Sequence, residues 1–332
     1  MAEQVDQGEL VIRPFRTGDE AKVNQAFNTV FTTQRSLAEW AWKFPPGDGS
    51  RPIMLAWQDG DLLAQYAATP VAFQLDDCVF SAAQIVDVFS TRQARRMGRR
   101  GVWVQTVEAF FEHYGESRRH PLLFGFPGRR ALRLGVLQLG YDAIPPQEIL
   151  YLERREPAPR GRAASRLYRA ELARDWEPRL DDLWRRCRRA YPVAAIRGSA
   201  RALGRLAGRP GGHYHRFLVF PRLSPSPVAF AAFRVLDDAL MWVDLVWDHE
   251  HPGALHLLAR LAAGLGRQEG VACERLWLNG DPEGVRELER AGFDRLPEPS
   301  GLVFVARAFG PDVDVQLLDE RIYLTMADAD LV

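Results

Sequence analysis

The stretch that decides the fold runs from residue 85 to residue 114 and reads IVDVFSTRQARRMGRRGVWVQTVEAFFEHY. It begins inside an apolar run, residues 81–89, that predicts a buried strand interrupted by the carboxylate of Asp87. Four arginines follow between residues 95 and 100, and an apolar 3.6-residue period then predicts a helix over residues 102–114. Strand, basic loop and helix N-terminus form an arrangement suited to binding phosphate.

The elements on either side of this stretch predict a sheet flanked by helices. Apolar runs at residues 52–57, 62–68 and 71–80, with turn signals at Asp59-Gly60 and Asp76-Asp77, predict an antiparallel meander. Helical patterns at residues 21–31 and 36–44 precede the meander. Beyond residue 114 the pattern predicts a strand at 121–126, a helix at 129–139 and a last strand of the first domain at 144–152.

The chain of 332 residues is long enough for two domains, and residues 154–162 have the prolines and the missing periodicity of a linker. We therefore expect domains at residues 1–155 and 165–332, joined by a linker at 156–164. The second half repeats the order of elements of the first. Its closest echo is Leu139-Gly140-Tyr141 against Ala291-Gly292-Phe293, at the end of the late helix of each half.

Composition excludes several classes of protein. Forty-three basic and 43 acidic residues give a formal net charge of +0, so no overall positive charge attracts the protein to nucleic acid or to an anionic membrane. The three cysteines are far apart and support neither a zinc site nor a disulfide framework. The start of the sequence is acidic and polar rather than a secretory leader, and no long apolar run occurs, so we expect a cytoplasmic protein without membrane insertion.

The order of elements, with the loop ending Arg99-Arg100-Gly101-Val102, resembles the GCN5-related N-acetyltransferase (GNAT) superfamily. More narrowly, the sequences at residues 40–44, 86–89 and 124–127 resemble its tandem, two-domain Eis-like branch. This resemblance implies an α/β (α+β) fold of two tandem GNAT-like domains, each with a mixed, mostly antiparallel sheet flanked by helices. It also implies transfer of an acetyl or other short acyl group from acyl-CoA to a primary amine of a small molecule or sugar, with acetyl-CoA or another acyl-CoA as co-substrate and no metal.

The resemblance assigns the coenzyme A pyrophosphate to the loop and the helix start. The residues so assigned are Arg95, Arg96, Met97, Gly98, Arg99, Arg100, Gly101 and Val102. The backbone near Val88 and Phe89 would hold the thioester carbonyl if the strand splays from its neighbour there. The alternative for the arginines is a solvated basic face. The matching loop of the second half, residues 248–253, is acidic and lacks arginine, so we expect no coenzyme binding there.

Asp87 is the predicted general base, because a desolvated carboxylate can take a proton from an ammonium group directly or through water. An equally weighted alternative is a buried carboxylate satisfied by an arginine or by backbone N–H groups. Trp40 and Trp42 lie two positions apart and cannot share a helix face, so one packs and the other covers an acceptor pocket. The tyrosine that family members often use as general acid is replaced by Val136.

Two hypotheses remain open. The first is an N-acyltransferase whose first domain binds the cofactor and whose second domain helps to build the acceptor pocket. The second is a catalytically silent acyl-CoA-binding sensor or scaffold, which the missing tyrosine favours. The expected partner is a small-molecule amine and not a nucleic acid, and a homo-oligomer is compatible with the sequence.

Overall fold

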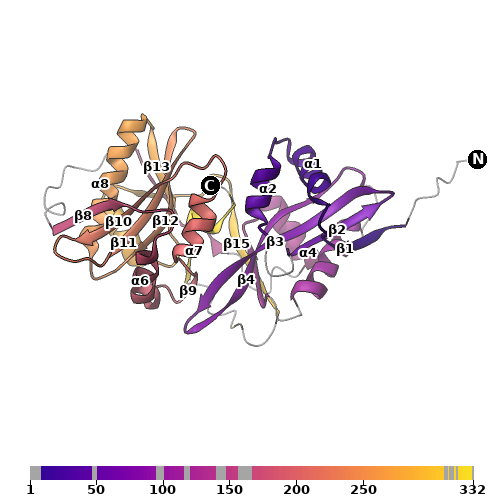
Figure 1. Cartoon of the computed structure of the whole chain (residues 1–332), viewed down its shortest axis with the longest axis horizontal. Coiled ribbons are helices and arrows are strands. Elements are labelled where there is room, and N and C mark those ends of the chain that lie inside the picture. Colours follow the sequence, from indigo (N-terminus) through magenta and orange to yellow (C-terminus); the bar gives the residue numbers. More distant parts are fainter. Residues whose placement is uncertain are drawn as a thin grey trace, which may run out of the picture. The chain divides into compact units, whose positions relative to one another are not determined.

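The computed structural model describes residues 9–46, 51–94, 101–115, 120–139, 147–155, 167–309, 313, 318 and 321–330. The chain forms two compact units (Figure 1). Unit 1 comprises Met1–Val71, Phe80–Pro146 and Val305–Val313, and unit 2 comprises Ala72–Val79, Gln147–Phe304 and Asp314–Val332. Each unit is therefore assembled from several segments of the sequence.

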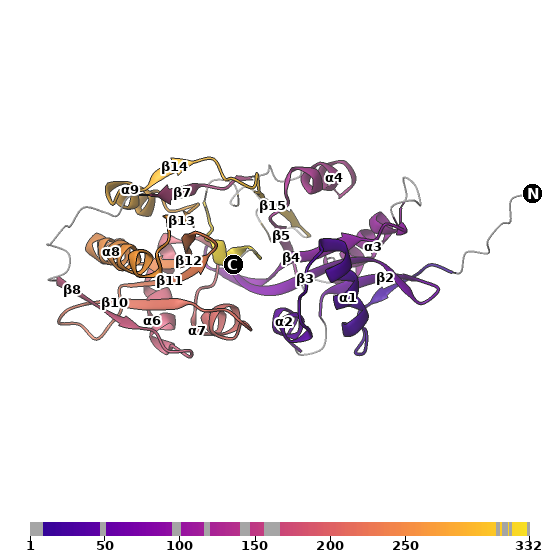
Figure 2. The ribbon, with the colours of Figure 1, turned by 90° about the horizontal axis from the view of Figure 1, so that it is seen from above.

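Unit 1 contains a mixed sheet with helices on both faces. The strand order is β1 (Val11–Pro14), β2 (Ile53–Gln58), β3 (Asp61–Leu75), β4 (Cys78–Ser90), β5 (Leu122–Gly125) and β15 (Val303–Ala308). Strands β4 and β5 pair in parallel. Figure 2 shows α1 (Glu20–Phe31) and α2 (Leu37–Lys43) on one face of this sheet, and α3 (Val102–Phe110) and α4 (Arg129–Leu139) on the other. A π-helical turn, Phe111–Gly115, continues α3.

The alternation of side chains along β2 explains how both faces are covered. Ile53 and Leu55 belong to an apolar cluster with Trp40 of α2. Ala56, one position on, belongs to a second cluster with Val102 of α3. Because successive residues of a strand point to opposite faces, one strand anchors both helical layers.

Unit 2 repeats this plan with a seven-stranded sheet. Its order is β14 (Asp294–Leu296), β7 (Tyr151–Arg154), β13 (Cys273–Trp277), β12 (Ala239–Trp247), β11 (Ala229–Leu236), β10 (His215–Pro221) and β8 (Tyr168–Leu172). Helices α8 (Pro252–Glu269) and α9 (Pro282–Arg290) lie on one face, and α6 (Pro178–Cys187) and α7 (Ser199–Ala202) on the other (Figure 2). A π-helical turn, Leu203–Ala207, continues α7.

Short strands complete unit 2. Strand β9 (Val193–Ala195) pairs with the last residues of β3 and with β16 (Ile322–Tyr323), and β6 (Gln147–Glu148) pairs with the first residues of β15. The two mixed sheets flanked by helices confirm the predicted fold class. Strands β9, β14 and β16 were not predicted from the sequence, because three or fewer residues carry no readable period.

Three sequence predictions differ from the structure. The runs at 62–68 and 71–80 are not two strands: β3 continues through Pro70 to Leu75, and the turn falls at Asp76, whose φ of 50° is left-handed. The strand expected at 144–152 as the last of the first domain is instead β7, which pairs with β13 in unit 2. Conversely, β15 supplies residues 305–308 to β5 in unit 1. The expected linker, 156–164, lies outside the described residues.

Candidate functional site

The connection from β4 to α3 is the centre of the candidate site. Strand β4 pairs with β5 at Ala83↔Leu123 and Gln84↔Phe124, and then continues to Ser90. Its backbone beyond Gln84 therefore runs past the residues that pair with β5, and the splay expected near Val88 and Phe89 stays a prediction. At residue 125 the strands are close, because an added Cβ would lie 3.3 Å from the Cβ of Ile85 and Ile85 would have to shift by a few tenths of an ångström.

Both ends of the arginine-rich loop are anchored. At its start, the Thr91 amide donates to the Leu63 carbonyl at 2.8 Å, and Ala94 is buried in the same cluster as Val102. At its end, Gly101 is the N-cap of α3 and has no side chain to cap the first amides. The helix N-terminus therefore presents its dipole toward the loop. The predicted contacts of Arg95, Arg96, Met97, Gly98, Arg99 and Arg100 lie outside the described residues.

Asp87 interrupts β4 with an unusual backbone conformation. Its φ is 50°, a left-handed value that aspartate tolerates better than most residues. Its backbone carbonyl accepts a hydrogen bond from the side-chain nitrogen Nε2 of Gln65, on β3, at 2.9 Å. The side chain is only 2% exposed. One carboxylate oxygen accepts from Arg35 and the other from Lys43, the last residue of α2.

Arg35 is held in place by helix α1 through its own backbone and side chain. The Arg35 carbonyl accepts from Asn24 at 2.8 Å and from Asn28 at 2.9 Å, and its amide donates to Asn28 at 2.9 Å. The guanidinium lies over the ring of Phe27, 3.7 Å from the centroid, and donates to the Asn24 side chain. Asp87 therefore ties β4 to the connection between α1 and α2.

Unit 2 contains an equivalent of the Arg35 and Asp87 pair. Arg197 stands directly before Gly198, the N-cap of α7, just as Arg35 stands directly before Ser36, the N-cap of α2. Arg197 donates to Asp244 at 2.9 Å. Asp244 lies on β12, next to an extra residue in the pairing with β11. The pair recurs where no coenzyme is expected, which favours an architectural role for Asp87.

The two predicted acceptor-pocket tryptophans lie in different surroundings. Trp40 is 1% exposed and packs against Phe15 and Phe44, with ring centroids 5.6 and 5.5 Å apart. This is the core position expected for one of the pair. Trp42 is half-buried on α2. Its role beside an acceptor pocket stays a prediction.

The two predicted thioester contacts, Val88 and Phe89, occupy the end of β4. Val88 is half-buried, whereas the Phe89 ring is buried against Phe27 and Phe31 with centroid distances of 6.4 and 6.3 Å. The Phe89 side chain therefore belongs to the core and only its backbone is suited to a ligand contact. Val136 is half-buried on α4. The described tyrosines near this sheet, Tyr66 and Tyr114, are both 1% exposed.

Sequence reasoning missed Arg35, Lys43 and Gln65. A signal existed for Lys43, because the chain contains only two lysines and this one ends a short helix before a proline pair. Nothing in the spacing of Arg35 or Gln65 connects either residue to Asp87, because the contacts span 52 and 22 residues.

Other features of the described chain are less informative for function. A surface hollow of about 430 Å³ lies over α1, but its asparagines Asn24 and Asn28 are committed to Arg35. Within the described residues, no group of three or more histidine, cysteine, aspartate or glutamate side chains is placed to hold a metal ion. In the same part of the chain, no helix combines the length and apolar character needed to cross a membrane.

Comparison with protein families finds a match in the first part of the chain. Residues 11–135 match the family model of the acetyltransferase (GNAT) domain. This stretch includes β4, the arginine-rich loop, α3 and Asp87, and it is shorter than half of the chain. No curated protein matches the sequence. The narrower resemblance to the Eis-like branch stays a prediction.

Solved structures share the fold over almost the whole chain. A GCN5-related N-acetyltransferase from Anabaena variabilis aligns with a TM-score of 0.68 at 12% identity, covering 91% of this chain and 73% of that one. A probable N-acyltransferase from Enterococcus faecalis aligns with a TM-score of 0.66 at 14% identity, covering 94% and 74%. Saccharomyces cerevisiae N-myristoyltransferase with bound myristoyl-CoA aligns with a TM-score of 0.57 at 11% identity, covering 97% and 89%. The fold is thus that of GNAT-like acetyltransferases.

Proposed function

We propose that this protein is an N-acyltransferase that transfers an acetyl or other short acyl group from acyl-CoA to a primary amine of a small molecule or sugar. The observation that carries the proposal is the β4 to α3 connection, in which a strand running past its neighbour leads through four arginines into an uncapped helix N-terminus. The GNAT domain match over residues 11–135 supports it. Unit 1 is the proposed cofactor-binding domain and unit 2 its diverged copy.

The residues present fit acyl-CoA. The first amides of α3 after Gly101 suit a pyrophosphate, because a helix N-terminus carries partial positive charge and no side chain caps this one. Arginines 95, 96, 99 and 100 add charge-assisted contacts in the proposal. The bound cofactor supplies an activated acyl thioester. Backbone N–H groups near Val88 and Phe89 would polarise its carbonyl and orient it toward the amine.

The attacking amine must lose a proton before or during acyl transfer. Both oxygens of Asp87 already accept from cations, which leaves this carboxylate poorly placed to receive a substrate proton. We therefore propose Asp87 as a positioning residue that holds β4 against α2, with water taking the proton. Its role as general base stays a prediction that a single variant can test.

The alternative is a catalytically silent acyl-CoA-binding sensor. Two observations favour it: the ion-paired Asp87, and the half-buried Val136 at the position where family members often carry a tyrosine. Both proposals include a cytoplasmic location, which imaging of a tagged protein in intact cells would check.

A binding and turnover experiment separates these functions. Calorimetry with coenzyme A and acetyl-CoA measures binding, and release of the free thiol from acetyl-CoA measures turnover with an amino sugar, an aminoglycoside, an amino acid and a peptide amine. We expect binding that weakens as salt is raised, and turnover with at least one amine. Binding of coenzyme A or acetyl-CoA with no turnover on any of the four amines supports the sensor. A folded protein that binds neither compound at low salt rules out both.

A further inference from the structure

Unit 2 contains a slot of the same construction as the one proposed for the cofactor in unit 1. Strand β12 pairs in parallel with β13 from Ala239↔Cys273 to Trp242↔Leu276, and then continues alone along this edge to Trp247. Strands β4 and β5 likewise pair in parallel before β4 continues to Ser90. Each long strand then leads to a helix, α8 in unit 2 and α3 in unit 1.

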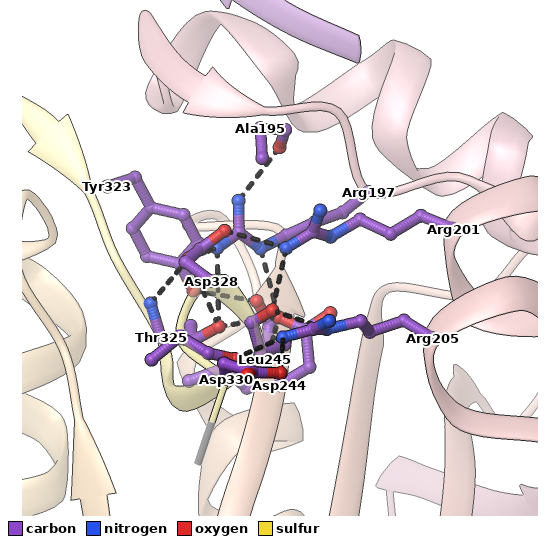
Figure 3. A network of polar contacts seen from close by, with 12 residues as sticks. Ala195, Arg197, Arg201, Arg205, Asp244, Leu245, Tyr323, Thr325, Asp328 and Asp330 are labelled. Atoms are coloured by element: carbon purple, nitrogen blue, oxygen red, sulfur yellow. Dashed lines mark hydrogen bonds and ion pairs between the residues drawn. The ribbon is translucent and has the colours of Figure 1, made fainter. Parts of the chain in front are cut away.

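A segment near the end of the sequence, residues 321–330, bonds to both edges of this slot. Leu324 exchanges two backbone hydrogen bonds with Asn279, which follows β13, at 3.2 and 3.3 Å. The Tyr323 hydroxyl donates to the carbonyl of Leu245 on β12 at 2.6 Å (Figure 3). Ile322, Tyr323 and Leu324 are each 2% exposed or less. The segment therefore fills the divergence between β12 and β13.

The segment also completes the ion pair at Asp244. The Thr325 hydroxyl donates to the Asp244 carboxylate at 2.9 Å, on the same oxygen that accepts from Arg197. In unit 1 the second partner of the equivalent Asp87 is Lys43, which comes from helix α2. A residue of segment 321–330 has thus taken the position of a helix side chain.

Three arginines at four-residue spacing hold the segment down (Figure 3). Arg197 and Arg201 both donate to Asp328, whose side chain is 2% exposed and also accepts from the Thr325 amide at 2.8 Å. Arg201 donates to the Ala327 carbonyl at 2.9 Å, and Arg205 donates to the Ala329 carbonyl. Because buried charges need partners, Asp328 and the first two arginines depend on one another.

Other groups of the slot also contact residues of the same chain. At the end of β12, the Trp247 amide donates to the Tyr191 hydroxyl at 3.2 Å, and that hydroxyl donates to the Trp247 carbonyl at 2.8 Å. Just before α8, His249 Nδ1 lies 3.0 Å from the Glu283 carboxylate, and His249 Nε2 lies 3.5 Å from the Asp281 carboxylate. The backbone at the end of β12 is thus already bonded to Tyr191, and the start of α8 has carboxylates beside His249, which disfavour a phosphate.

We propose that residues 321–330 act as a built-in ligand that permanently occupies the second acyl-CoA slot, so that the chain binds one acyl-CoA. The comparison between the two slots rests on the proposed function of unit 1. The occupancy itself rests on the contacts in unit 2 alone.

A pair of matched glycine variants tests the occupancy in the full-length chain. Gly280 has φ +70°, and an added Cβ would lie 2.6 Å from the carbonyl carbon of Ile322. Gly270 has φ +69°, and an added Cβ would meet nothing within 4 Å. Gly280→Ala and Gly270→Ala therefore impose the same backbone strain, but only the first forces segment 321–330 out of its place.

Amide hydrogen exchange read by peptide mass spectrometry is the measurement. In the unmodified protein we expect residues 321–328 to be protected to the same degree as β11. In Gly280→Ala we expect the exchange rate of residues 321–328 to rise about tenfold or more relative to that of β11. In Gly270→Ala we expect the ratio of these two exchange rates to equal that of the unmodified protein. Exchange at the rate of an unstructured peptide in the unmodified protein, or equal ratios in both variants, would overturn the proposal.

A second pair of variants and a titration keep the proposal testable if Gly280→Ala fails to fold. Asp328→Asn removes the carboxylate that Arg201 contacts and leaves Arg197 paired with Asp244 alone, so it should also release the segment. Asp330→Asn, whose carboxylate is 4.0 Å from Arg205, should not. Calorimetry on the unmodified protein should give one coenzyme A per chain, and two would refute the occupied slot. No binding at all would overturn the proposed function of unit 1, while protected residues 321–328 in the same sample would still support occupancy.

Discussion

Replacing Asp87 by asparagine distinguishes an architectural carboxylate from a catalytic base. Asparagine matches aspartate in size and tolerates the left-handed φ of 50°, so the backbone of β4 should not be strained. The change removes only the charge. It leaves the cations of Arg35 and Lys43, which are 10% and 6% exposed, without their carboxylate.

The expected cost follows from this burial. Breaking a buried ion pair by removing one partner costs roughly 3–5 kcal/mol, because the remaining charge stays desolvated. For a unit of this size each kcal/mol lowers the melting temperature by about 2–4 °C, so we expect a drop of about 6–20 °C. A base role instead predicts a loss of about 10²–10⁴-fold in turnover with little change in melting or cofactor affinity.

Two further variants sharpen the comparison. Asp244→Asn makes the equivalent change in unit 2 and should destabilise that unit, because Arg197 is only 1% exposed and loses one of its carboxylate partners. Coenzyme affinity should not change, because the proposed cofactor site lies in unit 1. Adding Lys43→Met to Asp87→Asn removes one of the two cations that faced the lost carboxylate and should restore part of the lost stability, with a coupling of about 0.5–3 kcal/mol. Unchanged melting of Asp87→Asn with collapsed turnover would refute the architectural assignment.

Three other perturbations have distinct expected outcomes. The charge reversals Arg99→Glu and Arg100→Glu together should abolish coenzyme A binding in calorimetry. The double variant His249→Gln with Glu250→Gln in unit 2 should leave that binding nearly unchanged. Equal losses of binding in both double variants would contradict a single cofactor domain. Burial lowers the pKa of His249, but Asp281 and Glu283 outweigh it and raise that pKa above its ordinary value. The stabilisation from His249 should therefore be complete below about pH 6.5 and disappear as pH rises through the folded-state pKa. The difference in melting temperature between the unmodified protein and His249→Gln should accordingly shrink from about pH 5.5 to about pH 8. A difference that grows with pH would contradict the raised pKa of His249. Burial raises the pKa of the Cys187 thiol to about 12, so at about pH 8 a maleimide should label the exposed Cys78 and leave Cys187 unmodified in the folded protein, as mass spectrometry of tryptic peptides would show.

Local signals in the sequence determined most of the element order. Periods of 2 and 3.6 residues predicted the strands and helices that surround the site, and the two turn signals correspond to left-handed residues at Asp59, Gly60 and Asp76. The capping residue Ser36 begins α2 as its type predicts, with Glu39 completing the capping box. These features depend on neighbours within a few residues, which is why one sequence suffices to find them.

Tertiary structure alone decided which residues meet. Arg35 reaches Asp87 across 52 residues, β15 joins β5 from the other half of the sequence, and Thr325 reaches Asp244 across 81 residues. Such contacts follow from how strands are ordered in a sheet and how helices cover it, and no period or spacing encodes them. The apolar strand around Asp87 indicated that a buried carboxylate needs a partner, but only the folded chain supplied the two cations that occupy it.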